Sequence, residues 1–380
     1  MPPRTPTITS MTSTGIRHEH SFSMDREGHK WLMVTVQSRS RSTASAPAFL
    51  EGDTITGHLE LDVNRPEAIK EVTIAVEGVL TSVQQDELKF LSMKTILWRP
   101  DGKSDKFFGK YAWGFTFTLP PQVAVGQAMY RLPPNYSEKT LSSTFVDYRL
   151  VANVKRGSFK PNITISQGFI YKPVSTPPPP SMRRQMAYRS GHAPPSPAED
   201  PEGWKVLPTQ SVRGRTLGRS VAEVRCTLAI ALPLCYSAKS TIPLAMMMAS
   251  NDEQSLAQLS NPSAVRVTLM KHVVTGPGEK KSNVVKVVAG RANFWSSNNN
   301  YGHGVRYLEG ALEIPAGLQP SFEFPKLTVQ YTVDLLPLGA WGPAQFDAHR
   351  ETAVLSEYIT LTMMQPSGST TRLPASGLAR

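Results

Sequence analysis

Side chains that could support catalysis or hold a metal are few in this chain of 380 residues. His18-Glu19-His20 offers two imidazoles, but a zinc site needs three or four ligands, and no convincing third ligand accompanies the pair. Gly302-His303-Gly304 follows an Asn-rich run and is typical of a hairpin tip rather than of a phosphate-binding loop. The sequence has no nucleophile elbow, Walker loop, dinucleotide fingerprint or Cys-x-x-Cys pair. We therefore expect a protein that is not an enzyme, with no metal site and no cofactor.

One ligand motif is recognisable, the PPxY sequence Pro133-Pro134-Asn135-Tyr136. WW domains bind such sequences because the prolines are already held in a polyproline II conformation and pack into aromatic grooves, so little entropy is lost on docking. The motif predicts a WW-domain ligand formed by Pro133, Pro134 and Tyr136.

Two groups of basic residues are candidates for binding anions. The first follows a strand-like stretch and could contact phosphates or acidic tails: Lys155, Arg156 and Lys160. The second lies near a predicted domain junction and could face an anionic headgroup: Arg213, Arg215 and Arg219. The alternative for both groups is ordinary solvated charge at the end of a strand.

Three serines are candidates for phosphorylation. Ser40 and Ser42 lie beside arginines, which suits basophilic kinases, and Ser196 precedes Pro197, which suits a proline-directed kinase. The alternative is that these serines belong to a solvated loop and to a spacer.

The composition favours anionic partners. The formal net charge is +11 and the pI is about 9.6, which suits anionic lipid, phosphorylated peptide or nucleic acid. No zinc-finger spacing, RNP-like strand or basic recognition helix is present, so we expect no binding to nucleic acid. An anionic membrane surface fits better, because Lys and Arg near such a surface contribute about 1 kcal/mol each. The N-terminus lacks the apolar segment of a signal peptide and no run is long enough to cross a membrane, which predicts a cytosolic protein.

Alternating apolar and polar residues predict strands through most of the chain. In Phe49–Leu61 a Gly-Asp turn leads directly into a strand, and Val72–Gly78, Trp113–Leu119 and Val146–Gly157 alternate in the same way. Seven further strand candidates with turn residues between them lie between Val221 and Met364, which is typical of a β-sandwich. The one helix-like piece there is Asp252–Leu259.

The distribution of prolines divides the chain. We expect a disordered tail over residues 1–18, a first β-sandwich over 19–172, a Pro-rich linker over 173–204, a second β-sandwich over 205–366 and a short disordered tail over 367–380. The linker composition buries too little apolar surface to offset the entropy of ordering, so an extended polyproline II spacer is predicted.

The order of these motifs resembles the arrestin family, and more closely the α-arrestin-like proteins common in fungi. The resemblance rests on an aromatic residue followed by Glu-Gly-Asp-x-Ile-x-Gly, then IKEVTIAVEG, WGFTFTLP and VDYRLVANVKRG in that order. Cys226–Pro233, Ser240–Leu244, Leu318–Phe324 and Leu327–Tyr331 are similar to parts of the family's C-terminal domain. The resemblance implies two tandem arrestin-like, immunoglobulin-like antiparallel β-sandwiches.

The resemblance also implies a function. α-Arrestins are cytosolic adaptors, peripheral at the plasma membrane or endosomes, that bind cytoplasmic parts of membrane proteins for endocytosis or sorting. They use PPxY motifs to recruit HECT-type ubiquitin ligases through WW domains. Arrestin-like sequences also carry a Leu-Pro-Pro-x-aromatic stretch inside the first sandwich, and Leu132–Tyr136 sits at that place, so Tyr136 could instead be packed. Two alternatives remain: a retromer-like trafficking scaffold, and a phosphopeptide-binding or structural module with no ubiquitin link.

Overall fold

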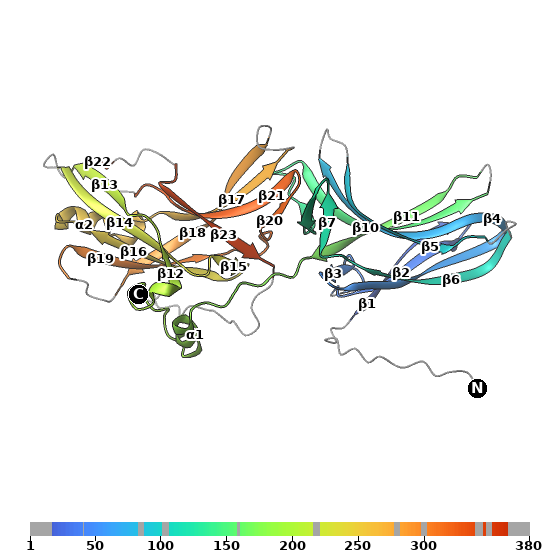
Figure 1. The fold of residues 1–380 in the computed structure, drawn as a ribbon, viewed down its shortest axis with the longest axis horizontal. Helices are drawn as coiled ribbons and strands as arrows, with labels where there is room; N and C mark the ends of the chain where they lie inside the picture. The colour runs from blue at the N-terminus through green and yellow to red at the C-terminus, as the bar shows by residue number, and fades with distance from the viewer. Residues whose placement is uncertain are drawn as a thin grey trace. The chain divides into compact units, whose positions relative to one another are not determined.

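The chain folds into two compact units. The structure is a computed structural model that describes residues 17–40, 42–82, 87–100, 106–157, 160–215, 221–276, 282–297, 302–338, 345–346 and 352–363. One unit comprises residues 1–137 and 145–173, and the other comprises 138–144 and 174–380. Each unit is described by itself below (Figure 1).

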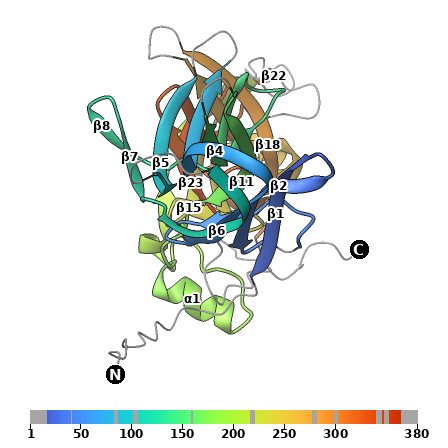
Figure 2. The same cartoon turned by 90° about the vertical axis from the view of Figure 1, so that its right-hand side faces the viewer.

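The first unit is a curled, largely antiparallel sheet with the order β1-β2-β4-β10-β11-β3, to which β5, β6 and β9 are added. Figure 2 shows the curl around β2, β4 and β6. A separate hairpin is formed by β7 and β8. The strands are β1 (His18–Arg26), β2 (His29–Ser38), β3 (Ala48–Leu50), β4 (Thr54–Ser82), β5 (Leu88–Trp98), β6 (Lys106–Thr118), β7 (Gln122–Val125), β8 (Ala128–Arg131), β9 (Tyr136–Ser137), β10 (Thr144–Arg156) and β11 (Ile163–Lys172).

Strand β4 is the longest strand of the first unit and pairs with several others. It merges the two strands predicted at Phe49–Leu61 and Val72–Gly78 into one continuous element of 29 residues. Its first part pairs with β2 and β6, and its second part pairs with β5. The alternating residues point into one core, where Leu59 and Ile74 of β4 are buried together with Trp31, Tyr148 and Phe169. The predicted alternation correctly identifies the buried face in Thr54–Leu61, whereas in Val72–Val76 both faces are buried, Thr73 and Ala75 included.

The Glu51-Gly52-Asp53 turn that leads into β4 has a local physical cause. Gly52 has a φ of +81°, a conformation that side chains with a Cβ rarely adopt. The Asp53 carboxylate accepts hydrogen bonds from the backbone N–H of Leu50 at 2.9 Å and from Arg39 Nε at 2.8 Å. The backbone conformation of Gly52 and the hydrogen bonds accepted by Asp53 therefore fix this turn, and both residues belong to the turn itself.

The second unit contains a further sheet with the order β15-β23-β21-β17-β18-β19-β16-β14-β13-β22, joined by β12 and β20. Its strands are β12 (Trp204–Val206), β13 (Gln210–Arg215), β14 (Val221–Ala231), β15 (Cys235–Ser237), β16 (Thr241–Ala249), β17 (Val267–Thr275), β18 (Asn283–Ser296), β19 (Val305–Glu313), β20 (Phe322–Phe324), β21 (Leu327–Leu335), β22 (Gln345–Phe346) and β23 (Leu355–Thr362). The predicted helix is confirmed as α2 (Glu253–Leu259), which begins after Asp252, whose side chain accepts the N–H of Ser255. Two short 3₁₀ turns lie at Pro201–Gly203 and Pro262–Ala264.

The predicted extended spacer over residues 173–204 differs from the structure. Helix α1 (Met182–Arg189) and the turn Pro201–Gly203 form within it, and from residue 174 onwards it belongs to the second unit. The prediction of an unpacked linker fails because it counted apolar side chains only. Arg184, a charged residue, is buried and holds the segment down through hydrogen bonds to backbone carbonyls.

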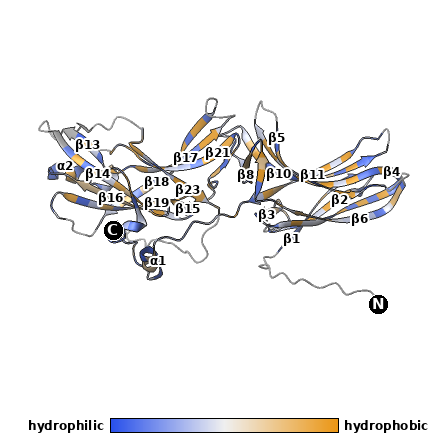
Figure 3. Ribbon diagram, in the orientation of Figure 1, coloured by the Kyte–Doolittle hydropathy of each residue, from blue (hydrophilic) through white to orange (hydrophobic). Residues whose placement is uncertain are grey.

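The fold class predicted from the sequence is confirmed: the protein is all-β, with two tandem units of curled, mainly antiparallel sheet. Colouring by hydropathy shows the alternation of apolar and polar residues along the strands of both units (Figure 3). Among the described residues, the short pairings of β3 with β11 and of β15 with β23 are parallel.

Candidate functional site

The residues considered for metal binding do not form a metal site in the described part of the chain, where no three His, Cys, Asp or Glu side chains gather around a common point. His18 and His20, expected at the edge of a disordered tail, lie in β1. His20 is buried, and burial lowers the pKa of its imidazole. His303 is exposed and lies 3.1 Å from Glu253.

The PPxY motif is part of the first core, and its assignment as a WW-domain ligand is wrong for the folded chain. Pro133 and Pro134 are buried, and Tyr136 has 0% exposure. The Tyr148 hydroxyl donates to the carbonyl oxygen of Pro133 at 2.7 Å, and Asn135 bonds the backbone of β11 at two points. A WW domain would have to grip the prolines and the tyrosine, all of which face the interior.

The three phosphorylation candidates lie in different surroundings. Ser40 is buried and its hydroxyl donates to the carbonyl of Ser42 at 3.0 Å, so the folded chain does not present it to a kinase. Ser42 is exposed. Ser196 is half-buried, and its hydroxyl and its backbone N–H both donate to Glu199 Oε2 at 2.8 Å.

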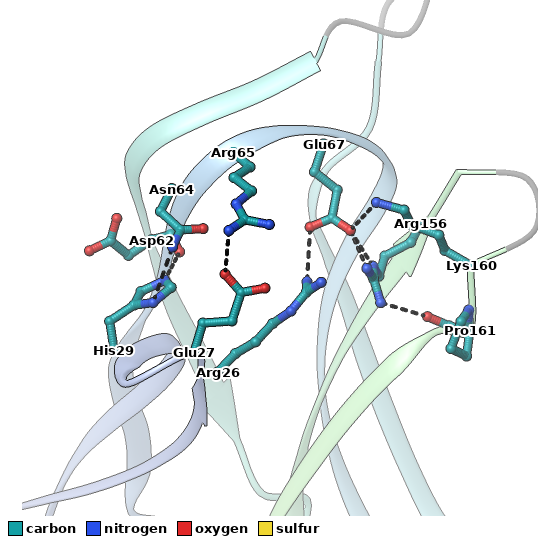
Figure 4. Close-up of polar contacts among 10 residues, drawn as sticks. All are labelled: Arg26, Glu27, His29, Asp62, Asn64, Arg65, Glu67, Arg156, Lys160 and Pro161. Carbon is teal, nitrogen blue, oxygen red and sulfur yellow. Dashed lines mark hydrogen bonds and ion pairs between the residues drawn. The ribbon is translucent and has the colours of Figure 1, made fainter.

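The first predicted basic group is brought together around a buried carboxylate. Glu67 of β4 is 5% exposed, and Figure 4 shows Arg26, Arg156 and Lys160 converging on it. Arg156 Nε lies 2.6 Å and Lys160 Nζ 3.2 Å from Glu67 Oε1, while Arg26 Nη1 lies 3.3 Å from Oε2. Burial opposes ionisation of Glu67, but the hydrogen bonds from Arg156 and Lys160 outweigh it and lower the pKa of the carboxyl.

A second buried carboxylate, Glu71, repeats this arrangement four residues further along β4. Arg99 Nη2 lies 2.6 Å from its Oε2, and Lys155 Nζ and Lys94 Nζ lie 2.8 and 3.8 Å from its Oε1. The bonds from Arg99 and Lys155 lower the pKa of Glu71 from 4.5 to about 2. Lys155 and Arg156 are consecutive at the end of β10, and they contact different glutamates: Lys155 pairs with Glu71 and Arg156 pairs with Glu67.

We call these eight residues the cationic cluster; they are Glu67, Glu71, Arg26, Lys94, Arg99, Lys155, Arg156 and Lys160. Six positive charges surround two carboxylates, which leaves an excess of four among the described residues. Arg156 is buried, but Lys94, Arg99, Lys155 and Lys160 are about half exposed. The glutamates therefore orient the cations without neutralising them, and the charge left over faces solvent.

Packing at the strand ends positions the cluster. The Arg26 and Arg156 guanidinium carbons lie 5.9 and 6.0 Å from the ring centre of buried Trp31, within range of a cation–π contact. The N–H of Gly157 donates to the carbonyl of Ala68 at 2.8 Å, which ties the end of β10 to β4. Two neighbouring polar contacts, Arg65 with Glu27 and His29 with Asp62, join the turn between β1 and β2 to β4 (Figure 4).

The second predicted basic group lies only in part within the described residues. Arg213 is exposed and lies 3.4 Å from Glu223 across the β13–β14 pair. The backbone of Arg215 pairs with Val221 in β14 and with Gln345 in β22. Arg219 lies outside the described residues. Of this group, Arg213 is the residue whose side chain the structure describes, and it forms an ion pair with Glu223.

A second feature that could bind a ligand is the segment 181–204, which we call the strap. Arg184 Nη1 donates to the Leu232 carbonyl at 2.6 Å and its Nη2 donates to the Gly203 carbonyl, and its guanidinium lies 5.0 Å from the Trp204 ring centre. Trp204 Nε1 in turn donates to the Pro195 carbonyl at 3.0 Å. A cleft of about 520 Å³ lies between the strap and strands β16, β18 and β19.

Sequence analysis found three of the six cations, Lys155, Arg156 and Lys160, but missed the other three and both glutamates. Glu67 and Glu71 looked like ordinary polar positions in Arg65-Pro66-Glu67-Ala68-Ile69-Lys70-Glu71. Their spacing of four places both on one face of a strand, and that was the available signal. This spacing does not reveal which cations pair with the glutamates, because Arg156 lies 89 residues away along the chain from Glu67.

No protein-family model matches the chain, and a search of curated proteins finds no match. Within the described residues, no helix has the length and apolar character needed to cross a membrane. The cationic cluster of the first unit and the cleft beneath the strap of the second unit are two places in the described chain where polar side chains converge.

Proposed function

We propose that the protein is a non-enzymatic, arrestin-like adaptor that binds acidic or phosphorylated segments of the cytoplasmic tails of membrane proteins for sorting or endocytosis. Its place would be the cytoplasm, with peripheral residence at the plasma membrane or endosomes. The cationic cluster is the proposed tail-binding site. The observation that carries the proposal is the excess of four positive charges fixed on two buried glutamates.

The chemistry of the cluster suits phosphate better than a single carboxylate. Arg99 keeps unused donors beyond its bond to Glu71, and a guanidinium offers two parallel N–H groups that match phosphate oxygens. The half-exposed ammonium groups of Lys94, Lys155 and Lys160 supply further charge. Because the glutamates already restrain these side chains, a ligand loses less side-chain entropy on binding than it would at a bare lysine patch.

An open strand edge supports the same function. β1 is the end strand of its sheet, and within the described residues it pairs with β2 on one side. Its last residue, Arg26, belongs to the cationic cluster. An extended tail that adds to the outer edge of β1 would gain main-chain hydrogen bonds and bring acidic residues near the cluster.

The buried PPxY motif favours the form of this function that has no ubiquitin link through residues 133–136. Tyr136 is fully buried and Pro133 accepts a core hydrogen bond from Tyr148. We therefore propose a phosphopeptide-binding adaptor, and we do not propose recruitment of a ligase by this motif.

The test is binding of a serine-rich peptide, phosphorylated at two positions, compared with its unphosphorylated twin by fluorescence anisotropy. The wild type should prefer the phosphorylated peptide. The double variant Lys155→Gln with Lys160→Gln should lose about tenfold in affinity, since two exposed ion contacts are worth about 0.2–1 kcal/mol each. Each glutamate keeps an arginine in this variant, so the fold should persist.

The matched control is Lys205→Gln, which removes a half-exposed lysine that lies 2.8 Å from Glu357 in the second unit. It should leave peptide affinity unchanged. Vesicles with and without anionic lipid form a separate arm. Equal affinity for the two peptides would contradict the proposal, and so would an equal loss of affinity in Lys205→Gln. Binding to anionic vesicles but to neither peptide would indicate that the cluster binds a membrane surface instead of a protein tail.

A further inference from the structure

The cleft beneath the strap lies wholly in the second unit and is separate from the cationic cluster. Its volume of about 520 Å³ falls within the range of about 300–1,000 Å³ that is usual for small-ligand sites. One wall is the strap, with prolines and Trp204. The other wall is the outer face of β16, β18 and β19, with Trp295, Tyr307 and Glu309.

The sheet wall holds a carboxylate in a fixed orientation. Trp295 of β18 lies directly opposite Glu309 of β19 in the ladder. The indole Nε1 donates to Glu309 Oε2 at 3.2 Å, and the Ser297 hydroxyl bonds Oε1 at 3.0 Å. Each carboxylate oxygen can accept a second hydrogen bond, so Glu309 is oriented but keeps capacity for a ligand.

Aromatic rings flank this carboxylate. Tyr307 lies two residues before Glu309 on the same face of β19, and it packs against a cluster formed by Trp204 with three small residues, Ala229, Ala231 and Ala245. The alanines leave a recess in the sheet surface that the Trp204 ring fills. The bond from Trp204 Nε1 to Pro195 then fixes the strap over the recess.

The charge of the cleft is opposite to that of the whole chain. Glu199 and Glu309 line it together with Arg183 and with His192, which the formal charge at pH 7 counts as neutral, and Arg183 donates to the backbone carbonyl of Glu199. The cleft is therefore net negative in a protein with a formal charge of +11. A small anion or a phosphate would meet unfavourable charge there.

We propose that the strap cleft binds an organic cation, held by the Glu309 carboxylate and by the aromatic faces of Trp295 and Tyr307. Aromatic rings attract guanidinium and alkylammonium groups through the negative potential of their faces, and the attraction grows when the cation is shielded from water. The strap shields one side of the site. The proposal goes beyond the tail-binding function and stands or falls independently of it.

The first test compares choline with 3,3-dimethylbutan-1-ol, its neutral isostere, by calorimetry and by the NMR shift of the Trp295 indole N–H on the full chain. The two probes share shape and differ in charge. Choline should bind at least about tenfold more tightly than the alcohol, which corresponds to the strength of a partly desolvated cation–π contact with an ion pair. Equal binding of both probes would overturn the proposal, and so would the absence of saturable binding by every cationic probe.

The second test assigns the site. Glu309→Gln should weaken binding of the cation about tenfold, whereas Glu313→Gln, an exposed glutamate on the same strand, should leave it unchanged. Trp295→Phe should retain binding and Trp295→Leu should lose it, because only the former keeps an aromatic face. If Glu309→Gln fails to fold, the comparison of choline with its neutral isostere on the wild-type protein still decides whether the chain binds an organic cation.

A third arm distinguishes the source of the cation with N-acetyl-arginine amide and N-acetyl-trimethyllysine amide as probes. Tighter binding of an amino-acid amide than of choline indicates a basic peptide side chain. Tighter binding of choline indicates a free or headgroup quaternary ammonium. Either result supports a cation site, and loss of binding in Glu313→Gln as large as in Glu309→Gln would place the ligand elsewhere and overturn the assignment.

Discussion

Tyr136 illustrates how one residue type can serve two opposite purposes. In an exposed PPxY motif its ring is the ligand, whereas here it is enclosed beside β10, where Val146 pairs with it. The hydroxyl of Tyr148 bonds the carbonyl of Pro133, so the prolines help to close the same core. The motif was recognisable from the sequence, but its burial depends on strands that lie up to 36 residues away.

Tyr136→Ala should therefore destabilise the first unit by about 3–5 kcal/mol, because a buried aromatic ring would leave a cavity. Chemical denaturation followed by circular dichroism measures this loss. Tyr358→Ala, which removes an exposed tyrosine of the second unit, should change stability little. A Tyr136→Ala protein that stays as stable as wild type but no longer binds a WW domain would restore the ligand interpretation.

Glu71 predicts a specific dependence of stability on pH. Its pKa falls from an ordinary 4.5 to about 2 in the folded chain, so the unfolded chain binds a proton first as pH falls. The stabilisation by Glu71 is complete above pH 4.5 and is lost progressively towards pH 2. Melting temperature measured from pH 6 to pH 2.5 should drop more steeply in wild type than in Glu71→Gln. Parallel curves would show that Arg99 and Lys155 do not hold the carboxylate as described.

At the scale of elements, a glycine in β4 sets how closely three strands approach. A Cβ added at Gly57 would lie 2.1 Å from the backbone carbonyl oxygen of Thr35 in β2, and 2.8 Å from the Phe115 ring in β6. Backbone on one side cannot move away without breaking the β2–β4 ladder. The Gly in Glu-Gly-Asp-x-Ile-x-Gly is thus a packing requirement of the strand.

Gly57→Ala should destabilise the first unit by about 1–3 kcal/mol, the usual range for overpacking a core. Gly114→Ala is the matched control, because Gly114 lies opposite His58 in the neighbouring strand and its added Cβ would have a nearest contact at 4.0 Å. Thermal unfolding of both variants measures the difference. If Gly57→Ala were as stable as Gly114→Ala, β2 and β4 could move apart to admit the methyl group without loss of folding free energy, and the packing requirement would be wrong.

The elements that sequence predicted well are those with local causes. Alternation in Trp113–Leu119 places Phe115 and Phe117 in the core, and Asp252 begins the predicted helix. The length of β4 was not predicted, because the two strands at its ends were treated separately. Pro66 lies between them, where the pairing with β6 is irregular between Val63 and Glu67, so its missing N–H breaks no ladder bond there. Irregular pairing of this kind is set by the partner strand and cannot be seen in one segment.

At the scale of the whole molecule, the candidate sites depend on contacts between segments far apart in the sequence. Lys155, Arg156 and Lys160 were predicted as an anion site from their composition, and the structure brings them together with Arg26 and the two glutamates. The strap cleft was not predicted at all. Its walls come from a segment taken for a spacer and from strands β16, β18 and β19, which follow later in the chain, and no local pattern links Arg184 to the carbonyl of Leu232.

The strap also makes the division into units testable. Each unit has its own core, so the full chain should show a separate unfolding transition for each. Replacing residues 181–203 with a Gly-Ser segment of equal length keeps the reach of the chain but removes buried Arg184 and the bond from Trp204 to Pro195.

The transition of the second unit should shift downward by several degrees in this replacement, because charged hydrogen bonds from a buried arginine contribute about 1.5–3 kcal/mol each, while that of the first unit stays in place. Calorimetry resolves the two, and hydrogen exchange should rise in β12 and β14, which lie next to the strap. If the segment were only a spacer, both transitions would superimpose on those of wild type, because flexible residues of equal length leave the cores and their contacts unchanged.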